Sequence, residues 1–144
     1  MTYYSYEEFT SDIKSLKLPL EVYSPEAIVS IARGGVTFGH FISSMLDIRN
    51  LYTINSIHYN DTTKLDDIKI FNIPDLNNYE KILLVDDIVD SGDTLEEVLK
   101  VLNTKYPRLQ IKTASVFYKT SAKLIPDYKI KEATDWIEFF WEKI

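Results

Sequence analysis

The amino-acid sequence predicts an α/β protein with a doubly wound, mostly parallel sheet flanked by helices, in a single domain that covers residues 1–144. The first indication is an unbroken apolar run at residues 82–85, which is typical of a central parallel strand buried on both faces. Two adjacent carboxylates, Asp86 and Asp87, follow this strand directly. A polar loop and a helix pattern over residues 95–102 come next, so the order is strand, loop, helix.

A second unit of the same design lies earlier in the chain. Residues 27–31 (AIVSI) form another apolar run, and a helical spacing of apolar side chains covers residues 38–45. Between them stand Arg33, Gly34 and Gly35. Glycines let a backbone approach an anion closely, and arginine adds a permanent charge with several donors. Two strand–loop–helix units therefore indicate a parallel sheet with anion-binding loops at its carboxyl edge.

Shorter patterns predict the remaining elements. A helix is expected over residues 4–18, because apolar side chains recur there every three or four residues. Ser5 and Glu8 would form a capping box at its start. Further strands are expected over residues 51–56, 68–73 and 111–118, and a mobile polar loop over residues 61–67.

The composition limits the classes of function. Apolar residues make up 45% of the chain and aromatic residues 13%, which is sufficient for a packed core. A net charge of −6 argues against broad binding to nucleic acids or membrane surfaces, which requires a basic face. The lack of cysteine excludes disulfides and thiolate zinc sites. No signal peptide and no apolar run near 18 residues is visible, so a cytoplasmic location is expected.

The chemistry of the chain is concentrated in the loop after the central strand. Ser91, Gly92 and Thr94 stand where this loop turns into the helix. Backbone N–H groups at such a position form a concavity that binds phosphate. Asp86 and Asp87, at the carboxyl end of the strand, can reach sugar hydroxyls or a Mg²⁺ ion. A solvated acidic turn after a core strand is the simpler alternative, but it would not require this order of residues.

Residues 85–94, VDDIVDSGDT, resemble the signature of the type I phosphoribosyltransferases, whose loop binds the ribose 5-phosphate of phosphoribosyl pyrophosphate (PRPP). The resemblance implies that Asp86 and Asp87 face the ribose hydroxyls and a Mg²⁺ ion. It also implies PRPP contacts from the rest of the loop: Ile88, Val89, Asp90, Ser91, Gly92, Asp93 and Thr94. A receiver domain also carries paired acids at a strand end, but there the pair is expected after the first strand.

The same resemblance extends to the rest of the PRPP site. Arg33 and Gly34 match the family loop that binds pyrophosphate. The peptide bond between Ala32 and Arg33 is expected to be cis, because members of the family often have such a bond at this loop. The family also has a flap that closes over PRPP and often carries a basic residue, and Lys64 is the nearest candidate here.

The C-terminal part of the chain indicates the kind of base. Lys119 ends a strand, and residues 133–142 read ATDWIEFFWE, similar to the tail of the xanthine-guanine and related purine phosphoribosyltransferases. The resemblance implies that Lys119 meets the purine 6-oxo group, that Trp136 stacks on the base, and that the backbone of Ile137 reads the 2-position. Asp90 would lie near the purine N7 as general acid or base. The tail would form a small hood over the base site.

Several residues also have simpler interpretations. Taken alone, Lys119 would be a solvated strand end, and the aromatic tail a hydrophobic lid or a dimer contact. His58 is expected to be a surface or hydrogen-bonded residue, with a catalytic or metal-binding histidine as the alternative. Two features depart from the family pattern: Phe140 replaces a proline, and the chain ends soon after Trp141. Both concern base recognition and not PRPP binding.

The resemblance as a whole implies a purine-salvage enzyme that transfers the ribose 5-phosphate of PRPP to guanine, xanthine or hypoxanthine and releases pyrophosphate. Mg²⁺ would be its cofactor, and a homodimer or homotetramer its assembly. One alternative is a pyrimidine-using relative, against which Lys119 and the Trp136–Ile137 pair argue. The other is a non-enzymatic regulator that senses PRPP, and an acidic chain offers no obvious surface for nucleic acid.

Overall fold

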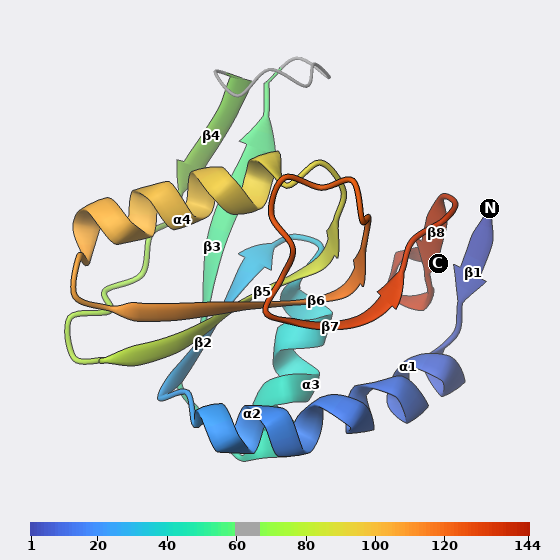
Figure 1. Ribbon diagram of the computed structural model, residues 1–144, viewed down its shortest axis with the longest axis horizontal. Coiled ribbons are helices and arrows are strands. Elements are labelled where there is room, and N and C mark those ends of the chain that lie inside the picture. The colour runs from blue at the N-terminus through green and yellow to red at the C-terminus, as the bar shows by residue number, and fades with distance from the viewer. Residues whose placement is uncertain (60–66) are drawn as a thin grey trace.

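The computed structural model describes residues 1–59 and 67–144 (Figure 1). Within them, a sheet of six strands has the order β4-β3-β2-β5-β6-β7, and only the β3–β4 pair is antiparallel. The predicted mostly parallel sheet is therefore confirmed. The strands are β2 (Ala27–Ala32), β3 (Leu51–His58), β4 (Ile68–Phe71), β5 (Lys81–Val89), β6 (Gln110–Tyr118) and β7 (Tyr128–Glu132).

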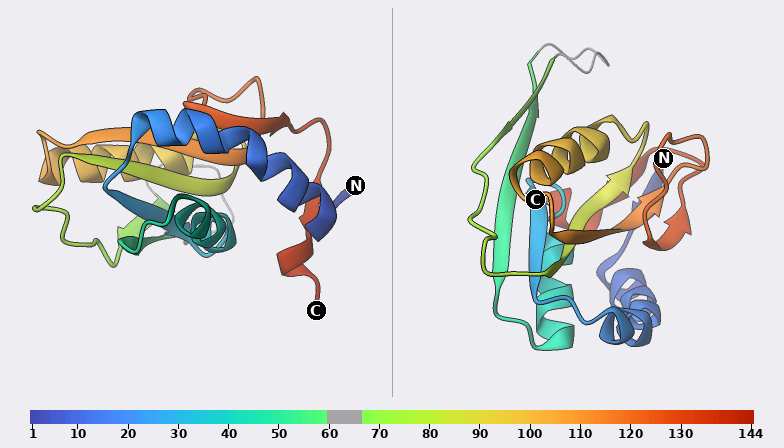
Figure 2. Two further views of the ribbon diagram at one scale, coloured as in Figure 1. Left: turned by 90° about the horizontal axis from the view of Figure 1, so that it is seen from below. Right: turned by 60° about the vertical axis from the view of Figure 1, so that its left-hand side comes forward.

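Helices cover both faces of this sheet (Figure 2). They are α1 (Tyr6–Asp12), the 3₁₀ turn η1 (Ile13–Leu16), α2 (Lys17–Tyr23), α3 (Val36–Leu46) and α4 (Asp93–Lys105). Because side chains alternate along a strand, Leu83 packs with the cluster under α1, α2 and α3, whereas Leu84 packs with the cluster under α4. This arrangement confirms the doubly wound fold. No helix in the described part of the chain is long and apolar enough to span a membrane.

The first helical segment differs from the single helix expected over residues 4–18. It begins at Tyr6, changes to the 3₁₀ turn η1 and continues as α2 to Tyr23. Apolar side chains that recur every three residues suit a 3₁₀ turn as well as an α-helix. Their spacing therefore could not show that the helix changes type at Ile13. Pro19 stands in the first turn of α2, where its missing N–H breaks no helical hydrogen bond.

The start of this helix follows the expected capping box. The Glu8 backbone N–H donates to Ser5 Oγ at 3.1 Å, and the Ser5 backbone N–H donates to Glu8 Oε2 at 3.4 Å. Two of the N–H groups that a helix start leaves unpaired are thereby satisfied.

A second, small sheet joins the two ends of the described chain. Strand β1 (Thr2–Tyr4) pairs in parallel with β8 (Ile137–Phe139), which is followed by the 3₁₀ turn η3 (Phe140–Glu142). Both ends of the chain therefore lie on the same side of the molecule in Figure 1. The strands β1, β7 and β8 were not predicted, because strands of three to five residues are too short to show a readable period.

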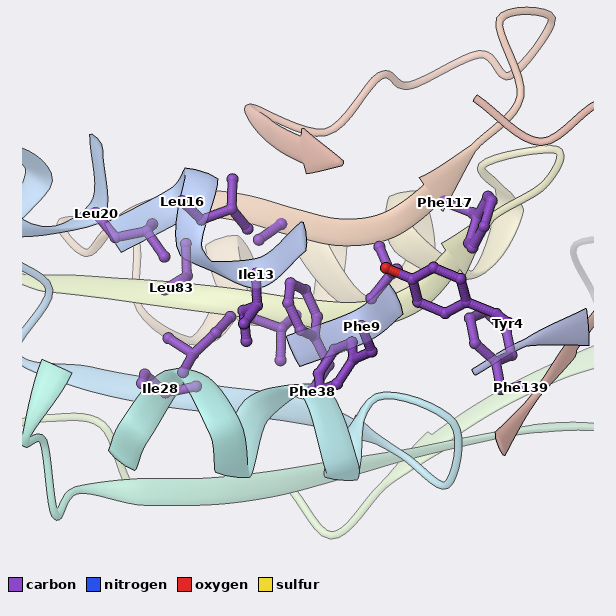
Figure 3. Close-up of a cluster of buried hydrophobic side chains, with 14 of the residues drawn as sticks. Tyr4, Phe9, Ile13, Leu16, Leu20, Ile28, Phe38, Leu83, Phe117 and Phe139 are labelled. Carbon is purple, nitrogen blue, oxygen red and sulfur yellow. The ribbon is translucent and has the colours of Figure 1, made fainter. Parts of the chain in front are cut away.

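Tyr4 fixes this small sheet to the core (Figure 3). Its ring is 1% exposed and makes edge contacts with Phe9, Phe117 and Phe139, at centroid distances of 6.3, 5.0 and 6.1 Å. Its hydroxyl donates to Asp12 Oδ2 at 2.7 Å. Phe139, Phe140 and Trp141 of the tail thus pack on the chain's own core. This packing places the tail beside the carboxyl ends of β5 and β6.

The sheet order places a crevice at its centre. From the adjacent strands β2 and β5, the chain continues through α3 to β3 on one side and through α4 to β6 on the other. The loops after β2 and β5 therefore diverge over opposite faces. In open α/β sheets, ligands bind at this switch point, outside the carboxyl ends of the strands.

Candidate active site

The loop after β5 has the form of an anion-binding turn. Gly92 caps α4 with a φ of 91°, a conformation that favours glycine, and Ser91 Oγ accepts the Asp93 backbone N–H at 3.2 Å. A cavity of about 330 Å³ is lined by residues 86–95, together with His58 from the end of β3. Residues 88–94, which were predicted to contact PRPP, all line this cavity: Ile88, Val89, Asp90, Ser91, Gly92, Asp93 and Thr94. Ile88 and Val89 belong to β5, which extends past Asp86 and Asp87 instead of ending before them as expected.

The Arg-Gly-Gly loop after β2 lies directly against the acidic end of β5. A Cβ atom on Gly34 would stand 2.5 Å from Asp87 Oδ2, and one on Gly35 would stand 2.7 Å from the Val85 carbonyl oxygen. Both positions therefore need glycine for the two loops to meet. Gly35 was not among the predicted site residues, although its place beside Gly34 was the available signal. The peptide bond between Ala32 and Arg33 is cis, as expected.

Asp86 and Asp87 form an inner acid pair at the half-buried end of β5. Burial, followed by repulsion from Asp87, raises the pKa of Asp86 well above its ordinary value, and burial also raises the pKa of Asp87. Two backbone groups contact their oxygens: the Asp87 N–H donates to Asp86 Oδ1 at 2.9 Å, and the Ile88 N–H donates to Asp87 Oδ1 at 2.7 Å. Within the described residues, neither acid forms an ion pair with a cation.

The inner pair offers the type of ligand that a divalent cation prefers, but too few ligands to hold one alone. Two close carboxylates without a cationic partner attract Mg²⁺, which prefers oxygen ligands. Over residues 1–59 and 67–144, however, no group of three or more acidic, histidine or cysteine side chains could hold a metal alone. Mg²⁺ is commonly bound by one or two carboxylates together with substrate oxygens, so the pair suits a metal that arrives with a phosphorylated ligand.

Two further acids of the loop are already paired with lysines. Lys119 Nζ lies 2.7 Å from Asp90 Oδ1, and Lys123 Nζ lies 2.6 Å from Asp93 Oδ1. The hydrogen bond from Lys123 is the largest cause of the lowered pKa of Asp93. Asp90 and Lys119 are both well exposed, so their ion pair contributes little to stability.

A second cavity, of about 240 Å³, adjoins the first. It is lined by the four residues that the resemblance assigns to the base, Asp90, Lys119, Trp136 and Ile137, which thus come from three separate parts of the chain. The Trp136 side chain is 73% exposed, so its ring is free to receive a flat ligand, whereas Ile137 is buried in β8. Because Asp87, Ile88 and Asp90 line both cavities, a ligand can extend from one into the other.

A third cavity, of about 690 Å³, lies beside Arg33 and Gly34 and is bounded on its other side by Trp141 and Glu142 of the tail. Glu142 also lines the second cavity, so the second and third cavities are neighbours. Phe140, which replaces the family proline, packs on Tyr6 and Phe9 and lines none of the three. Lys64 lies outside the described residues.

Sequence reasoning missed one side chain of the first cavity. His58 is exposed and its Nε2 lies 3.4 Å from Thr94 Oγ1, which agrees with the expected surface or hydrogen-bonded residue, but its place in the lining of the phosphate-loop cavity was not predicted. Its position at the carboxyl end of β3 was the available signal, since ligands collect at that edge of the sheet.

The fold and the crevice define the class of this protein: a doubly wound α/β protein with an anion-binding loop and an acid pair at its switch point. Residues 16–143 match the model of the phosphoribosyl transferase domain, and the chain belongs to this family. The expected type I phosphoribosyltransferase fold is thereby confirmed.

Individual relatives cover nearly the whole chain. The chain is 33% identical to a xanthine-guanine phosphoribosyltransferase of Cereibacter sphaeroides, over 96% of this chain and 84% of the relative. Among solved structures, it is similar to the xanthine-guanine-hypoxanthine phosphoribosyltransferase of Helicobacter pylori, with a TM-score of 0.90, 48% identity and coverage of 99% and 94%. A purine phosphoribosyltransferase of Pyrococcus horikoshii matches with a TM-score of 0.84 and 30% identity, over 99% and 94% of the two chains.

Proposed function

We propose that this protein is a purine phosphoribosyltransferase that transfers the ribose 5-phosphate of PRPP to a 6-oxopurine and releases pyrophosphate. One observation carries the proposal. Three neighbouring cavities bring together the anion-binding loop with the inner acid pair, the Arg33 loop that lies against Asp87, and the pocket with Lys119 and Trp136. The names of the relatives, all phosphoribosyltransferases of purines, support the same class of substrate.

The residues of the first and third cavities would bind PRPP. The backbone N–H groups of residues 90–94, with the hydroxyls of Ser91 and Thr94, would hold the 5-phosphate. Asp86 and Asp87 would face the ribose hydroxyls, and Arg33 would stabilise the charge that develops on the departing pyrophosphate. Asp86 and Asp87 would also hold Mg²⁺, which would supply further neutralisation of that charge.

The residues of the second cavity would choose and orient the base. An ammonium group donates hydrogen bonds and accepts none, so Lys119 suits the 6-oxo oxygen of guanine, xanthine or hypoxanthine and not the amino group of adenine. Trp136 would stack on any purine, and the backbone of Ile137 would read the 2-position. These contacts would place the base in line with the anomeric carbon of the ribose.

Asp90 would handle the proton at the purine N7. Without a ligand, its Oδ1 is 2.7 Å from Lys119 Nζ, so one ion pair connects the proposed acid–base residue with the proposed 6-oxo donor. A base that enters the cavity would receive the lysine at its 6-position and the carboxylate near N7, and the displacement would pass through an oxocarbenium-like state.

Two other functions remain as alternatives with less support. A pyrimidine-using enzyme would share the PRPP loop but would not need the Lys119 and Trp136 cavity. A PRPP-sensing regulator would bind PRPP without turnover. The finer properties stay predictions: action in the cytoplasm, a homodimer or homotetramer, and Lys64 as the flap residue.

A turnover assay tests the proposal. The purified protein would be given PRPP and Mg²⁺ with guanine, xanthine, hypoxanthine, adenine, uracil or orotate, and pyrophosphate release would be measured. We expect turnover with at least one 6-oxopurine and at least about 10⁴-fold lower kcat/KM with adenine, the size typical of sites built around one polar contact. Preferred use of uracil or orotate, or PRPP binding without turnover of any base, would contradict the proposal.

A further inference from the structure

The segment after β6 lies along the phosphate loop and is held there by its backbone. The Lys119 N–H donates to the Val89 carbonyl at 2.9 Å, and the Lys123 N–H donates to the Ser91 carbonyl at 2.9 Å. A Cβ atom on Gly92 would stand 3.0 Å from the Leu124 nitrogen, so the two segments are in close contact. The position of Lys123 therefore does not depend on its own side chain.

The phosphate loop carries a charge that its proposed ligand would oppose. Asp93 is the first residue of α4, where a carboxylate favours the helix, but there it also lies beside the groups that would hold a phosphate dianion. Its side chain is only 16% exposed, so water screens this charge poorly. Left alone, the Asp93 carboxylate would repel the 5-phosphate.

Lys123 is placed to cancel this charge. Its Nζ lies 2.6 Å from Asp93 Oδ1 and 3.5 Å from Glu96 Oε2, the next acid along the same helix. His58, which reaches the loop from β3, is the other titratable group whose charge acts on Asp93. Among the residues that the structure describes, Lys123 is the cation that forms an ion pair with Asp93.

We propose that Lys123 is a positioning residue of the phosphate loop, whose ammonium group neutralises Asp93 and so allows the loop to bind the phosphate of PRPP. The proposal rests on the proposed function, because PRPP is its ligand. It assigns the two lysines of one segment to different substrates. Lys119 meets the base, whereas Lys123 adjusts the charge of the loop that binds PRPP.

A charge-cancelling pair of variants tests this role. Lys123→Met should raise the KM for PRPP about tenfold, the effect expected when one poorly screened charge opposes an anion near the protein surface. The KM for the base and kcat should change much less. Lys123→Arg should retain the wild-type value. Lys123→Met combined with Asp93→Asn should restore the KM for PRPP to within about threefold, because Asn keeps the backbone N–H and removes the charge.

The control is Lys100→Met, which changes the net charge equally but lies about two helical turns along α4 on an exposed face. Calorimetric titration with PRPP and Mg²⁺ measures the same affinities without turnover, so it decides the role of Lys123 even if the base assignment fails. An unchanged PRPP affinity in Lys123→Met would overturn the proposal. A double variant as weak as Lys123→Met would also overturn it, since neutralisation of Asp93 would then not be what Lys123 provides.

Discussion

The acids of the β5 end and its loop form two pairs with opposite electrostatics. The inner pair, Asp86 and Asp87, has raised pKa values and no cation in the described residues. The outer acids, Asp90 and Asp93, are each bound by a lysine from the segment after β6, at 2.7 and 2.6 Å. Four carboxylates within eight residues of sequence therefore differ in whether the protein itself supplies their counter-charge.

This difference indicates what each pair meets in the proposed reaction. A carboxylate pair that the fold leaves uncompensated favours a cation from outside, which agrees with the proposed Mg²⁺. Acids that the fold has already compensated can lie beside anionic phosphate or an uncharged base without repelling them. Unpaired, half-buried like charges lower the stability of the ligand-free protein. The inner pair therefore serves the proposed function at a cost in the free energy of unfolding.

The largest effect is expected from the inner pair. Asp86→Asn with Asp87→Asn should lower turnover by at least about 10³-fold, because both the ribose contacts and the metal ligands would be lost. Asn retains an oxygen that can accept the Asp87 and Ile88 N–H groups, so the fold should persist. Steady-state kinetics and a circular dichroism spectrum check both points. Near wild-type turnover in this variant would remove the inner pair from the mechanism.

A smaller but more selective effect is expected from Lys119. Lys119→Met should lower kcat/KM for a 6-oxopurine about 100-fold, since a charged hydrogen bond contributes about 1.5–3 kcal/mol. The KM for PRPP should stay close to wild type, the reverse of the result proposed for Lys123→Met. Kinetics with both substrates varied would show this split. If the two lysine variants raised the same KM, the division of labour between Lys119 and Lys123 would be wrong.

Trp136 should affect affinity without affecting choice. Its ring is 73% exposed, so Trp136→Ala should cost little stability but raise the KM of every purine used by about tenfold, as expected for a lost stacking contact. Trp136→Phe keeps a flat ring and should lie near wild type. Competition assays among guanine, xanthine and hypoxanthine measure the choice. A change in the order of preference with Trp136→Ala would contradict a stacking role.

The smallest effect is on stability, and it depends on pH. Because the folded protein holds the protons of Asp86 and Asp87 more tightly than the unfolded chain does, their contribution to the free energy of unfolding falls as pH rises from the ordinary pKa of 3.8 through the raised values. The double Asn variant lacks this decline. At pH 7 without ligands, it should therefore be more stable than wild type, with the difference vanishing near pH 3. Urea unfolding at several pH values measures this difference, and a constant difference across pH would refute the assignment.

The sequence predicts those parts of the fold and of the site that depend on residues adjacent in the chain. The buried strands β2 and β5, their loops and the start of α1 all follow from residues adjacent in the chain, and their bounds agree with the structure to within a few residues. The helix after the central strand, expected over residues 95–102, extends to Asp93–Lys105 because Gly92 caps it early.

What could not be predicted depends on partners distant in sequence. The β1–β8 pair joins residues 2–4 to residues 137–139, and a three-residue strand carries no period of its own. The ion pair of Lys123 with Asp93 requires the turn after β6 to lie on the phosphate loop, which no spacing in the sequence indicates. The electrostatic difference between the two acid pairs could not be predicted either, because it depends on which lysines lie beside each acid in the fold. In the sequence, all four residues are aspartates.

The most direct test of this contrast is calorimetric titration of PRPP with and without Mg²⁺, into wild type and into the Asp86→Asn, Asp87→Asn variant. If the inner pair receives the metal, Mg²⁺ should strengthen PRPP binding to wild type by at least about tenfold, equal to about 1.4 kcal/mol, and should leave the variant almost unchanged. The Lys100→Met variant should behave like wild type. An equal gain from Mg²⁺ in wild type and in the double Asn variant would contradict the assignment of the metal to the inner pair.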